Sequence, residues 1–330
     1  MADLDLQPVA RNLRFPEGPV AMADGSLLFV QIEGQELSRL TTHNKVETVV
    51  KLPGGPNGLA IGPDGAAYVC NNGGVFSFVK LPTDGDTGHA PGGGVTIPDP
   101  GGPPPGFTGG QIQRIALAKG APDRHHPTVL YDNFEGAPLI SPDDIVFDAT
   151  GGGFYFTASG AQYRDRIVKG GVYYGTIHGD PLKFVAAIPT ANGIGLSRDG
   201  TTLYVADTIF ARLWALDIAS PGVVRMPPPG IPDMPGKVVM TLPGYQMVDS
   251  LKVEAGGNVC VGTISLGGGG ITVYHPDGTP PRRIPVPDPF VTNLCFGVAD
   301  PRDVWITASG TGVIYKARWD RPGLPLAYTA

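Results

Sequence analysis

Six segments of the chain repeat one short pattern that combines a polar residue, an apolar run and a turn. In each segment an acidic or amide residue precedes the apolar run, and a turn that usually contains Gly follows seven residues later. These register residues are Glu17, Asn57, Asp143, Asn192, Asp249 and Asn293. A β-rich stretch follows every turn, as in SLLFVQ and TTLYVAD. Repeated strand–turn–strand units are typical of propeller blades, so the pattern predicts an all-β fold, a six-bladed β-propeller.

The repeat also sets the expected domain organisation. We expect residues 1–330 to form a single propeller domain, because repeat architectures often exceed the usual domain length. The segment at about 81–110 is rich in Gly and Pro and is interpreted as an inserted loop. Such a loop either covers the channel mouth as a lid or is only a mobile connection. The ring needs a closing strand, for which Leu4–Leu13 is a candidate, but the sequence does not say which terminus supplies it.

The register residues carry a chemical prediction as well. If equivalent positions of six blades face the central channel, their side-chain oxygens converge on one axis. Carboxylate and amide oxygens are the ligands of hard cations, and Ca²⁺ suits an oxygen-only set best. Any single Asp or Asn near a strand end could simply cap a turn, but six in one register favour an ion site.

Composition and charge limit the partners that we expect. The formal net charge of −6 offers no basic surface for nucleic acid or anionic lipid, so we expect neither nucleic acid nor membrane as a partner. The beginning of the chain, MADLDLQPVA, lacks the apolar core of a secretory signal, and no run of 18 apolar residues occurs. Cys70, Cys260 and Cys295 lie in apolar strand patterns and are interpreted as buried free thiols. We therefore expect a cytoplasmic protein that acts on a small molecule.

Four segments make a family resemblance specific. They are FPEGPVA, SPDDIVFDATGGGFYFT, ANGIGLSRDGTTLYVADT and VDSLKVE. Together they resemble the SMP-30/gluconolactonase/LRE-like six-bladed propellers, and most closely the drug-responsive staphylococcal-type calcium-dependent lactonases. Many gluconolactonases carry Asn-Asp where this chain has Asp143-Asp144, whereas the lactonase branch carries Asp-Asp.

The resemblance implies a Ca²⁺-dependent hydrolase that opens sugar lactones or small aliphatic or aromatic lactones. It places the metal ligands on Glu17, Asp143, Asn192 and Asp249, with Ser250 as an additional contact, and the catalytic acid/base on Asp249. Glu17, Asp143 and Asp249 carry three negative charges against the two positive charges of the ion. This excess would hold Ca²⁺ firmly and leave a carboxylate able to accept a proton.

Three further residues complete the predicted site. Asn57 and Asn293 either line the substrate pocket or bond to the channel backbone. The resemblance of Thr108–Gly110 and Glu135 to a loop of the lactonase branch implies a second, structural calcium, for which Glu135 is the candidate ligand; otherwise Glu135 is a solvated loop acid.

Two other functions remain open on the sequence alone. The same ion could serve phosphotriester or other ester hydrolysis, because a polarised oxygen and a nearby water suit either substrate. Alternatively, the chain is a non-catalytic binding propeller with a structural ion. A metal-independent condensing enzyme of the strictosidine-synthase type is disfavoured because all four predicted ligands are present: Glu17, Asp143, Asn192 and Asp249. The oligomeric state is not indicated.

Overall fold

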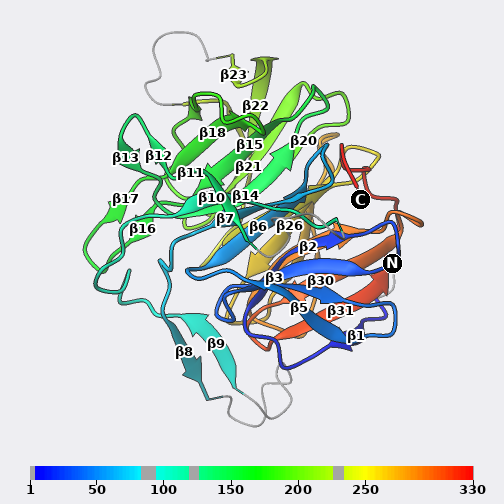
Figure 1. The fold of residues 1–330 in the computed structure, drawn as a ribbon. Coiled ribbons are helices and arrows are strands. Elements are labelled where there is room, and N and C mark those ends of the chain that lie inside the picture. The colour runs from blue at the N-terminus through cyan, green and yellow to red at the C-terminus, as the bar shows by residue number, and fades with distance from the viewer. Residues whose placement is uncertain (1–3, 83–93, 119–125, 226–233, 330) are drawn as a thin grey trace.

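Every regular element of the described chain is a β-strand (Figure 1). The computed structural model describes residues 4–82, 94–118, 126–225 and 234–329, and these ranges contain no helix, so none that could cross a membrane. Six separate antiparallel sheets of four or five strands form the blades. The prediction of a six-bladed β-propeller is confirmed.

The first three blades begin at the first three register residues. Blade 1 contains β2 (Pro16–Ala21), β3 (Leu27–Gln31), β4 (Glu36–Leu40) and β5 (Val46–Lys51). Blade 2 contains β6 (Pro56–Ile61), β7 (Ala67–Asn71), β10 (Gln111–Ile115) and β11 (Thr128–Tyr131). Blade 3 contains β14 (Pro142–Phe147), β15 (Gly153–Ala158), β18 (Gly171–Thr176) and β19 (Lys183–Ala186).

The second three blades repeat the arrangement with small variations. Blade 4 contains β20 (Ala191–Leu196), β21 (Thr202–Asp207), β22 (Arg212–Ser220) and β24 (Lys237–Thr241), with β23 (Val223–Val224) paired to the end of β22. Blade 5 contains β25 (Met247–Val253), β26 (Val259–Ile264), β27 (Gly270–Tyr274) and β28 (Arg282–Pro285). Blade 6 contains β29 (Val291–Phe296), β30 (Asp303–Ala308), β31 (Val313–Arg318) and β1 (Gln7–Ala10).

The N-terminal segment closes the ring. Strand β1 pairs antiparallel with β31, with Gln7 opposite Lys316 and Ala10 opposite Ile314. The first strand of each blade contacts the first strands of both neighbouring blades, in the cyclic order β2, β6, β14, β20, β25, β29 and back to β2. These six inner strands surround the central channel, and the question of which terminus supplies the closing strand is settled in favour of the N-terminus.

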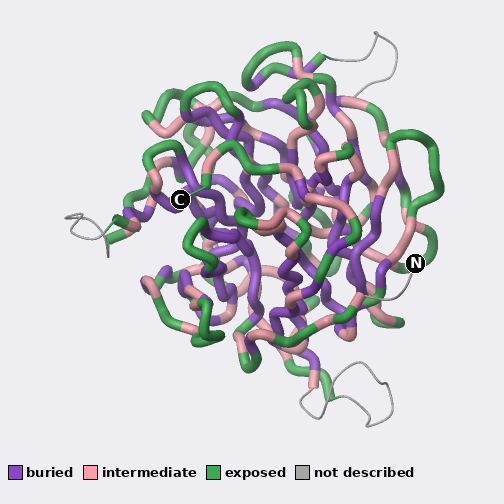
Figure 2. Tube along the Cα trace, turned by 90° about the vertical axis from the view of Figure 1, so that its right-hand side faces the viewer, coloured by how far each residue is buried: buried purple, intermediate pink, exposed green. Residues whose placement is uncertain are grey.

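Apolar side chains pack mainly between neighbouring blades. Leu28 of blade 1 belongs to one buried cluster with Leu59 and Val69 of blade 2, and other clusters join other neighbouring blades in the same way. Figure 2 shows buried residues along the strands of the interior and exposed residues mostly in the connections. The three cysteines are free and buried, as expected, and burial raises the pKa of each thiol.

The insertion in blade 2 is more ordered than the sequence suggested. Strands β8 (Phe78–Leu81) and β9 (Val95–Pro98) form a hairpin that stands out from the ring of blades (Figure 1). The interpretation of 81–110 as a loop is therefore wrong for Val95–Pro98, because alternating Val and Ile side chains there gain apolar partners. Residues 83–93, between these two strands, lie outside the described residues. Two further hairpins lie in connections. Strands β12 (Asn133–Phe134) and β13 (Ala137–Pro138) pair between blades 2 and 3, and β16 (Ala161–Gln162) and β17 (Ile167–Val168) pair between the second and third strands of blade 3.

The C-terminal segment crosses the face opposite the starts of the inner strands. After blade 6 it binds the end of blade 5, where Leu324 N–H donates to the Val253 carbonyl at 2.8 Å. It then reaches blade 3, where the Tyr328 ring packs edge-on against Phe147 with centroids 5.7 Å apart. Blades 5 and 3 are not neighbours, so this segment ties together blades that the ring itself keeps apart.

A fully buried carboxylate anchors this segment. Glu254 accepts hydrogen bonds from Trp319 Nε1 at 2.7 Å, from Arg321 Nη2 at 3.0 Å and from Asn258 Nδ2 at 2.6 Å. Burial alone would raise the pKa of Glu254, but the bonds from Arg321, Trp319 and Asn258 outweigh it and hold the pKa below its ordinary value. Glu254 is therefore negatively charged at neutral pH when it accepts these hydrogen bonds.

We expect Glu254→Gln to lower the free energy of unfolding by roughly 1.5–3 kcal/mol, because it removes the charge that Arg321 and Trp319 bind. Glu47→Gln is the matched control: Glu47 pairs with Lys45 at 2.9 Å on the surface, and its loss should change stability by less than about 0.5 kcal/mol. Denaturant unfolding of the two variants measures the difference. Equal midpoints would contradict an anchoring role for Glu254.

Candidate metal centre in the central channel

Each inner strand carries a β-bulge at the residue where the sequence repeat begins. In blade 2 the pairing runs from Pro56 opposite Asn71 to Leu59 opposite Val69, so one extra residue is inserted in the inner strand. The same irregularity occurs in the first strand of every other blade. A bulge redirects a side chain out of the regular alternation, and here it falls on the register residues.

The strand pairing corrects the register of blade 6. The residue that starts the bulge is Val291, which pairs with Ala308 as Pro16 pairs with Gln31 in blade 1. Thr292, and not Asn293, is therefore equivalent to Glu17. Counting back from the turn misplaced this residue because the turn of blade 6 is longer: it is closed by Gly297 and Asp303, whereas that of blade 1 is closed by Met22 and Ser26.

The position after the register residue faces the next blade at close range. A methyl group at Gly18 would lie 2.5 Å from the carbonyl oxygen of Asn57, and one at Gly193 would lie 2.5 Å from that of Asp249. At Gly58 it would collide with the Asp143 carbonyl oxygen in the same way. The other three blades place Asp144, Ser250 and Asn293 at this position. Glycine there lets the inner strands approach, and the three polar residues bond to their neighbours instead.

Glu17 is held in one orientation with one oxygen free. Its Oε2 accepts hydrogen bonds from Gly18 N–H and from Asn293 Nδ2, the latter at 2.7 Å. Its Oε1 is buried without any hydrogen-bond partner, and so is Oδ1 of Asn192. A buried oxygen without a hydrogen-bond partner destabilises the folded protein, which indicates that a ligand binds to these two atoms.

The carboxylates of the channel raise one another's pKa. Burial raises the pKa of Glu17 to about 7, and the charge of Asp144 adds to the effect. Burial likewise raises the pKa of Asp143, opposed by a hydrogen bond from Ser159 and reinforced by Asp144 and Glu17. For Asp249 the causes are burial and then the charges of Glu17 and Asp143. A cation among these groups would relieve this repulsion.

The donor set fits a hard cation such as Ca²⁺. Glu17, Asp143, Asn192 and Asp249 offer only oxygen atoms, and two of those oxygens lack partners. Within the described ranges, no three His, Cys, Asp or Glu side chains already converge as a ready-made metal cluster. The carboxylates are nevertheless close enough for their charges to raise one another's pKa. The unpartnered oxygens mark where a cation would bind.

The other predicted residues take different places. Asn57 is buried at its register position beside the channel. Ser250 is buried beside Asp249, and its hydroxyl helps to lower the pKa of Asp144, which burial raises. Asn293 contacts Glu17 and Lys252, so it connects channel residues. Glu135 is exposed at the tip of the β12–β13 hairpin, whose base meets Gly110 through the Leu139 carbonyl at 2.7 Å. The second calcium stays a prediction.

Sequence reasoning missed two charged residues of the channel. Asp144 is 2% exposed, and Lys252 Nζ lies 3.8 Å from its Oδ2. Both were visible in the motifs: Asp144 is the second acid of the Asp-Asp pair, and Lys252 stands in VDSLKVE where the other inner strands are apolar or contain Gly. With them, four carboxylates and one ammonium group share the channel.

The β8–β9 hairpin is anchored on the face that carries these residues. An inner strand begins, and a second strand ends, at the same face of an antiparallel blade. Phe78 packs on Phe15 with ring centroids 5.0 Å apart, and Val95 joins a buried cluster with Ile264 of blade 5 and Phe290 of blade 6. The insertion of blade 2 therefore packs against blades 1, 5 and 6 at the channel mouth.

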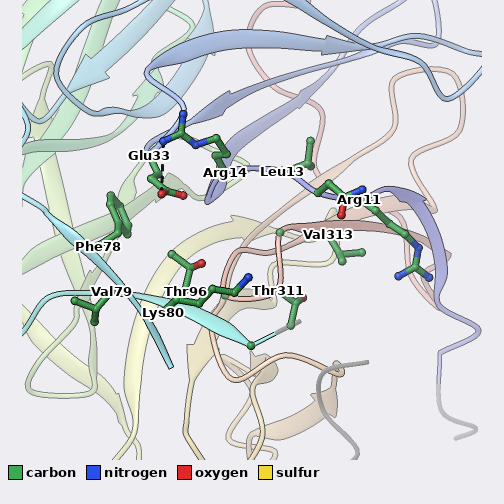
Figure 3. A pocket seen from close by; sticks show the side chains of 14 residues that line it. Arg11, Leu13, Arg14, Glu33, Phe78, Val79, Lys80, Thr96, Thr311 and Val313 are labelled. Atoms are coloured by element: carbon green, nitrogen blue, oxygen red, sulfur yellow. Dashed lines mark ion pairs between the residues drawn. The ribbon is translucent and has the colours of Figure 1, made fainter. Parts of the chain in front are cut away.

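A second hollow beside the hairpin has the opposite chemistry (Figure 3). This cavity of about 520 Å³ lies between the hairpin, the β1–β2 connection and the β30–β31 turn. Among the described residues, its lining contains the cationic Arg11, Arg14 and Lys80 and one carboxylate, Glu33, which is paired with Arg14 at 3.5 Å. Such a lining does not suit a cation, so the channel is the better candidate for a metal centre.

Comparison with known proteins places this geometry in a family. Residues 15–310 match the family model described as the SMP-30/gluconolactonase/LRE-like region. The chain belongs to this family of six-bladed propellers. The lactonase drp35 of Staphylococcus saprophyticus is 31% identical over 146 residues, which cover 44% of this chain and 42% of that relative. The match thus spans less than half the length of the relative.

Solved structures share the fold at low sequence identity. A gluconolactonase from Xanthomonas campestris has a TM-score of 0.70 and 19% identity, over 96% of this chain and 89% of that one. The calcium-binding protein regucalcin from Agrobacterium tumefaciens has a TM-score of 0.68 and 18% identity, over 99% and 97% of the two chains. At these identities the likeness establishes the fold alone.

We expect Gly58→Ala to destabilise the protein by about 1–3 kcal/mol, because the added methyl group would push the inner strand of blade 3 away. Gly256→Ala is the control, since a methyl group there meets nothing within 4 Å, and it should change stability by less than about 0.5 kcal/mol. Unfolding of both variants in denaturant tests the expectation. If Gly58→Ala unfolds at the wild-type midpoint, the inner strands are not as tightly constrained as described.

Proposed function

We propose that this protein is a Ca²⁺-dependent lactonase with its active site in the channel. Membership of the family and the match to a named lactonase support hydrolysis of a lactone. The likeness to regucalcin, a calcium-binding protein, and the all-oxygen donor set support Ca²⁺ as the ion. The substrate is a small lactone, and a cytoplasmic location and a second, structural calcium at Glu135 remain part of the proposal.

One observation carries the assignment of the catalytic group. Glu17, Asp143 and Asp144 are each 2% exposed, whereas Asp249 is only half-buried. Burial raises the pKa of Asp249, yet the residue keeps more exposed surface than Glu17, Asp143 or Asp144. A group that exchanges protons with a substrate needs both a raised pKa and access. An ion held only for structure would require neither.

Asp249 would both contribute to ion binding and perform the proton transfers, whereas the more buried residues would only hold the ion. Glu17, Asp143, Asn192 and Asp249 would hold Ca²⁺, which supplies positive charge to polarise the lactone carbonyl and stabilise the developing oxyanion. Glu17 presents Oε1 because Asn293 and Gly18 bind its other oxygen. Thus, the hydrogen bonds around Glu17 determine which oxygen faces the site.

Asp249 acts first as base and then as acid. Its Oδ1 accepts the Ser250 N–H at 3.0 Å, which leaves Oδ2 to take a proton. A water attacks the carbonyl carbon while Oδ2 accepts its proton, and the ring C–O bond then breaks. The proton passes from Oδ2 to the leaving alkoxide oxygen, so the product is a hydroxy acid and Asp249 is regenerated.

Metal removal tests the ion. We expect a chelator to abolish lactone hydrolysis and Ca²⁺ to restore it better than other divalent ions. Glu17→Gln should weaken Ca²⁺ binding more than Asn57→Ala, because Glu17 contributes a charge and an unpartnered oxygen. Calorimetric titration of both variants and metal analysis of the purified protein give the readout. Stoichiometric zinc without any response to Ca²⁺ would rule out the proposed ion.

Substitution of Asp249 separates binding from chemistry. Asp249→Asn keeps an oxygen ligand of nearly the same volume but cannot accept the proton, so we expect kcat to fall by about 10²-fold or more at saturating Ca²⁺. Asp143→Asn is the control and should cost much less. The assay panel should contain sugar, aliphatic and aromatic lactones and an aryl phosphotriester. If Asp143→Asn is the more damaging change, the base is another carboxylate; turnover of the phosphotriester alone would favour that alternative.

A further inference from the structure

One lysine lies among the carboxylates of the channel. Lys252 stands three residues after Asp249 on β25, and its side chain is only 18% exposed. In the other five blades this position is held by uncharged residues: Val20, Ala60, Val146, Gly195 and Cys295. A long cationic side chain at an inward position where five blades carry short uncharged ones needs a compensating partner.

Its ammonium group connects several blades. Lys252 Nζ donates to its neighbouring Leu251 carbonyl at 2.9 Å and to Asn293 Oδ1 of blade 6 at 3.3 Å. It also lies 3.8 Å from Oδ2 of Asp144 in blade 3, an oxygen that is buried and has no hydrogen bond. Blades 3, 5 and 6 therefore meet at one charged group.

Asn293 extends the connection to blade 1. Its Oδ1 faces Lys252, which leaves its Nδ2 to donate to Glu17 Oε2 at 2.7 Å. A flipped amide would place Nδ2 against the ammonium group and lose both bonds. Oδ1 of Asn293 also accepts the Leu294 N–H at 2.8 Å, so the lysine and this backbone bond together fix the orientation of Asn293. Asn293 in turn determines which Glu17 oxygen is free.

We propose that Lys252 is the built-in cation of the channel: it compensates Asp144 and positions Asn293 and Glu17, so that the site keeps its shape without a bound metal ion. This inference rests on the proposed function in one respect: the proposed function assigns ion binding to the site. Lys252 is a positioning residue, since it reaches Glu17 only through Asn293. A bound dication would also compensate the negative charge of the four carboxylates.

Stability of the metal-free protein tests the proposal. In excess chelator we expect Lys252→Met, which has a similar length and no charge, to lower Tm by roughly 4–7 °C, because it leaves Asp144 buried and unpaired. Lys252→Arg keeps the charge and should lose less. Added Ca²⁺ should raise the Tm of Lys252→Met more than that of the wild type, since the ion then neutralises more uncompensated charge.

A double variant separates charge compensation from simple packing. Asp144→Asn combined with Lys252→Met removes both charges, so we expect it to recover at least half of the lost Tm in chelator. If Lys252→Met cannot be obtained in soluble form, recovery of soluble protein by the double variant supports the proposal. A Lys252→Met Tm within about 2 °C of wild type in chelator, or a double variant no more stable than the single one, would overturn it.

The proposed function can fail independently. Absence of lactone hydrolysis, or of any Ca²⁺ effect on Tm in all variants, would count against the metal-dependent enzyme. The comparison of single and double variants in chelator would still decide the role of Lys252, because it uses neither substrate nor ion.

Discussion

The close approach of the six inner strands is the constraint on which the rest of the structure depends. Each inner strand bulges at its register residue, and the following position lies against the backbone of the next blade. Glycine at Gly18, Gly58 and Gly193 makes this distance possible, because any side chain there would meet a carbonyl oxygen. The same contacts bring the polar register residues to one end of the channel, so the geometry that closes the ring also assembles the site.

Charge is the second consequence of that assembly. Glu17, Asp143, Asp144 and Asp249 carry four negative charges into a narrow space, and burial raises the pKa of each. Lys252 offsets one of these charges. The remaining negative charge explains why a dication suits the channel, and the unpartnered oxygens of Glu17 and Asn192 mark where it would bind.

The two faces of the ring differ because segments outside the blades cover them differently. The β8–β9 hairpin packs on blades 1, 5 and 6 at the face where the register residues lie. The C-terminal segment crosses the opposite face and is anchored by Glu254, with Tyr328 packed on blade 3. The register residues thus lie on the face where the hairpin packs, and Glu254 anchors the segment that crosses the other face.

Local patterns in the sequence were enough to predict the number of blades, their first strands and five of the six register positions, because turns and alternating apolar residues are local signals. The family resemblance of its motifs implied Glu17, Asp143, Asn192 and Asp249 as metal ligands, which stays a prediction. The remaining features depend on contacts between blades. Strand pairing showed that Thr292 occupies the sixth register position, since a longer turn hides this from counting along the chain. It showed that Val95–Pro98 is a strand, because its apolar partners lie in blades 5 and 6. It also paired Lys252 with Asp144, which are far apart in sequence and meet only when the ring closes.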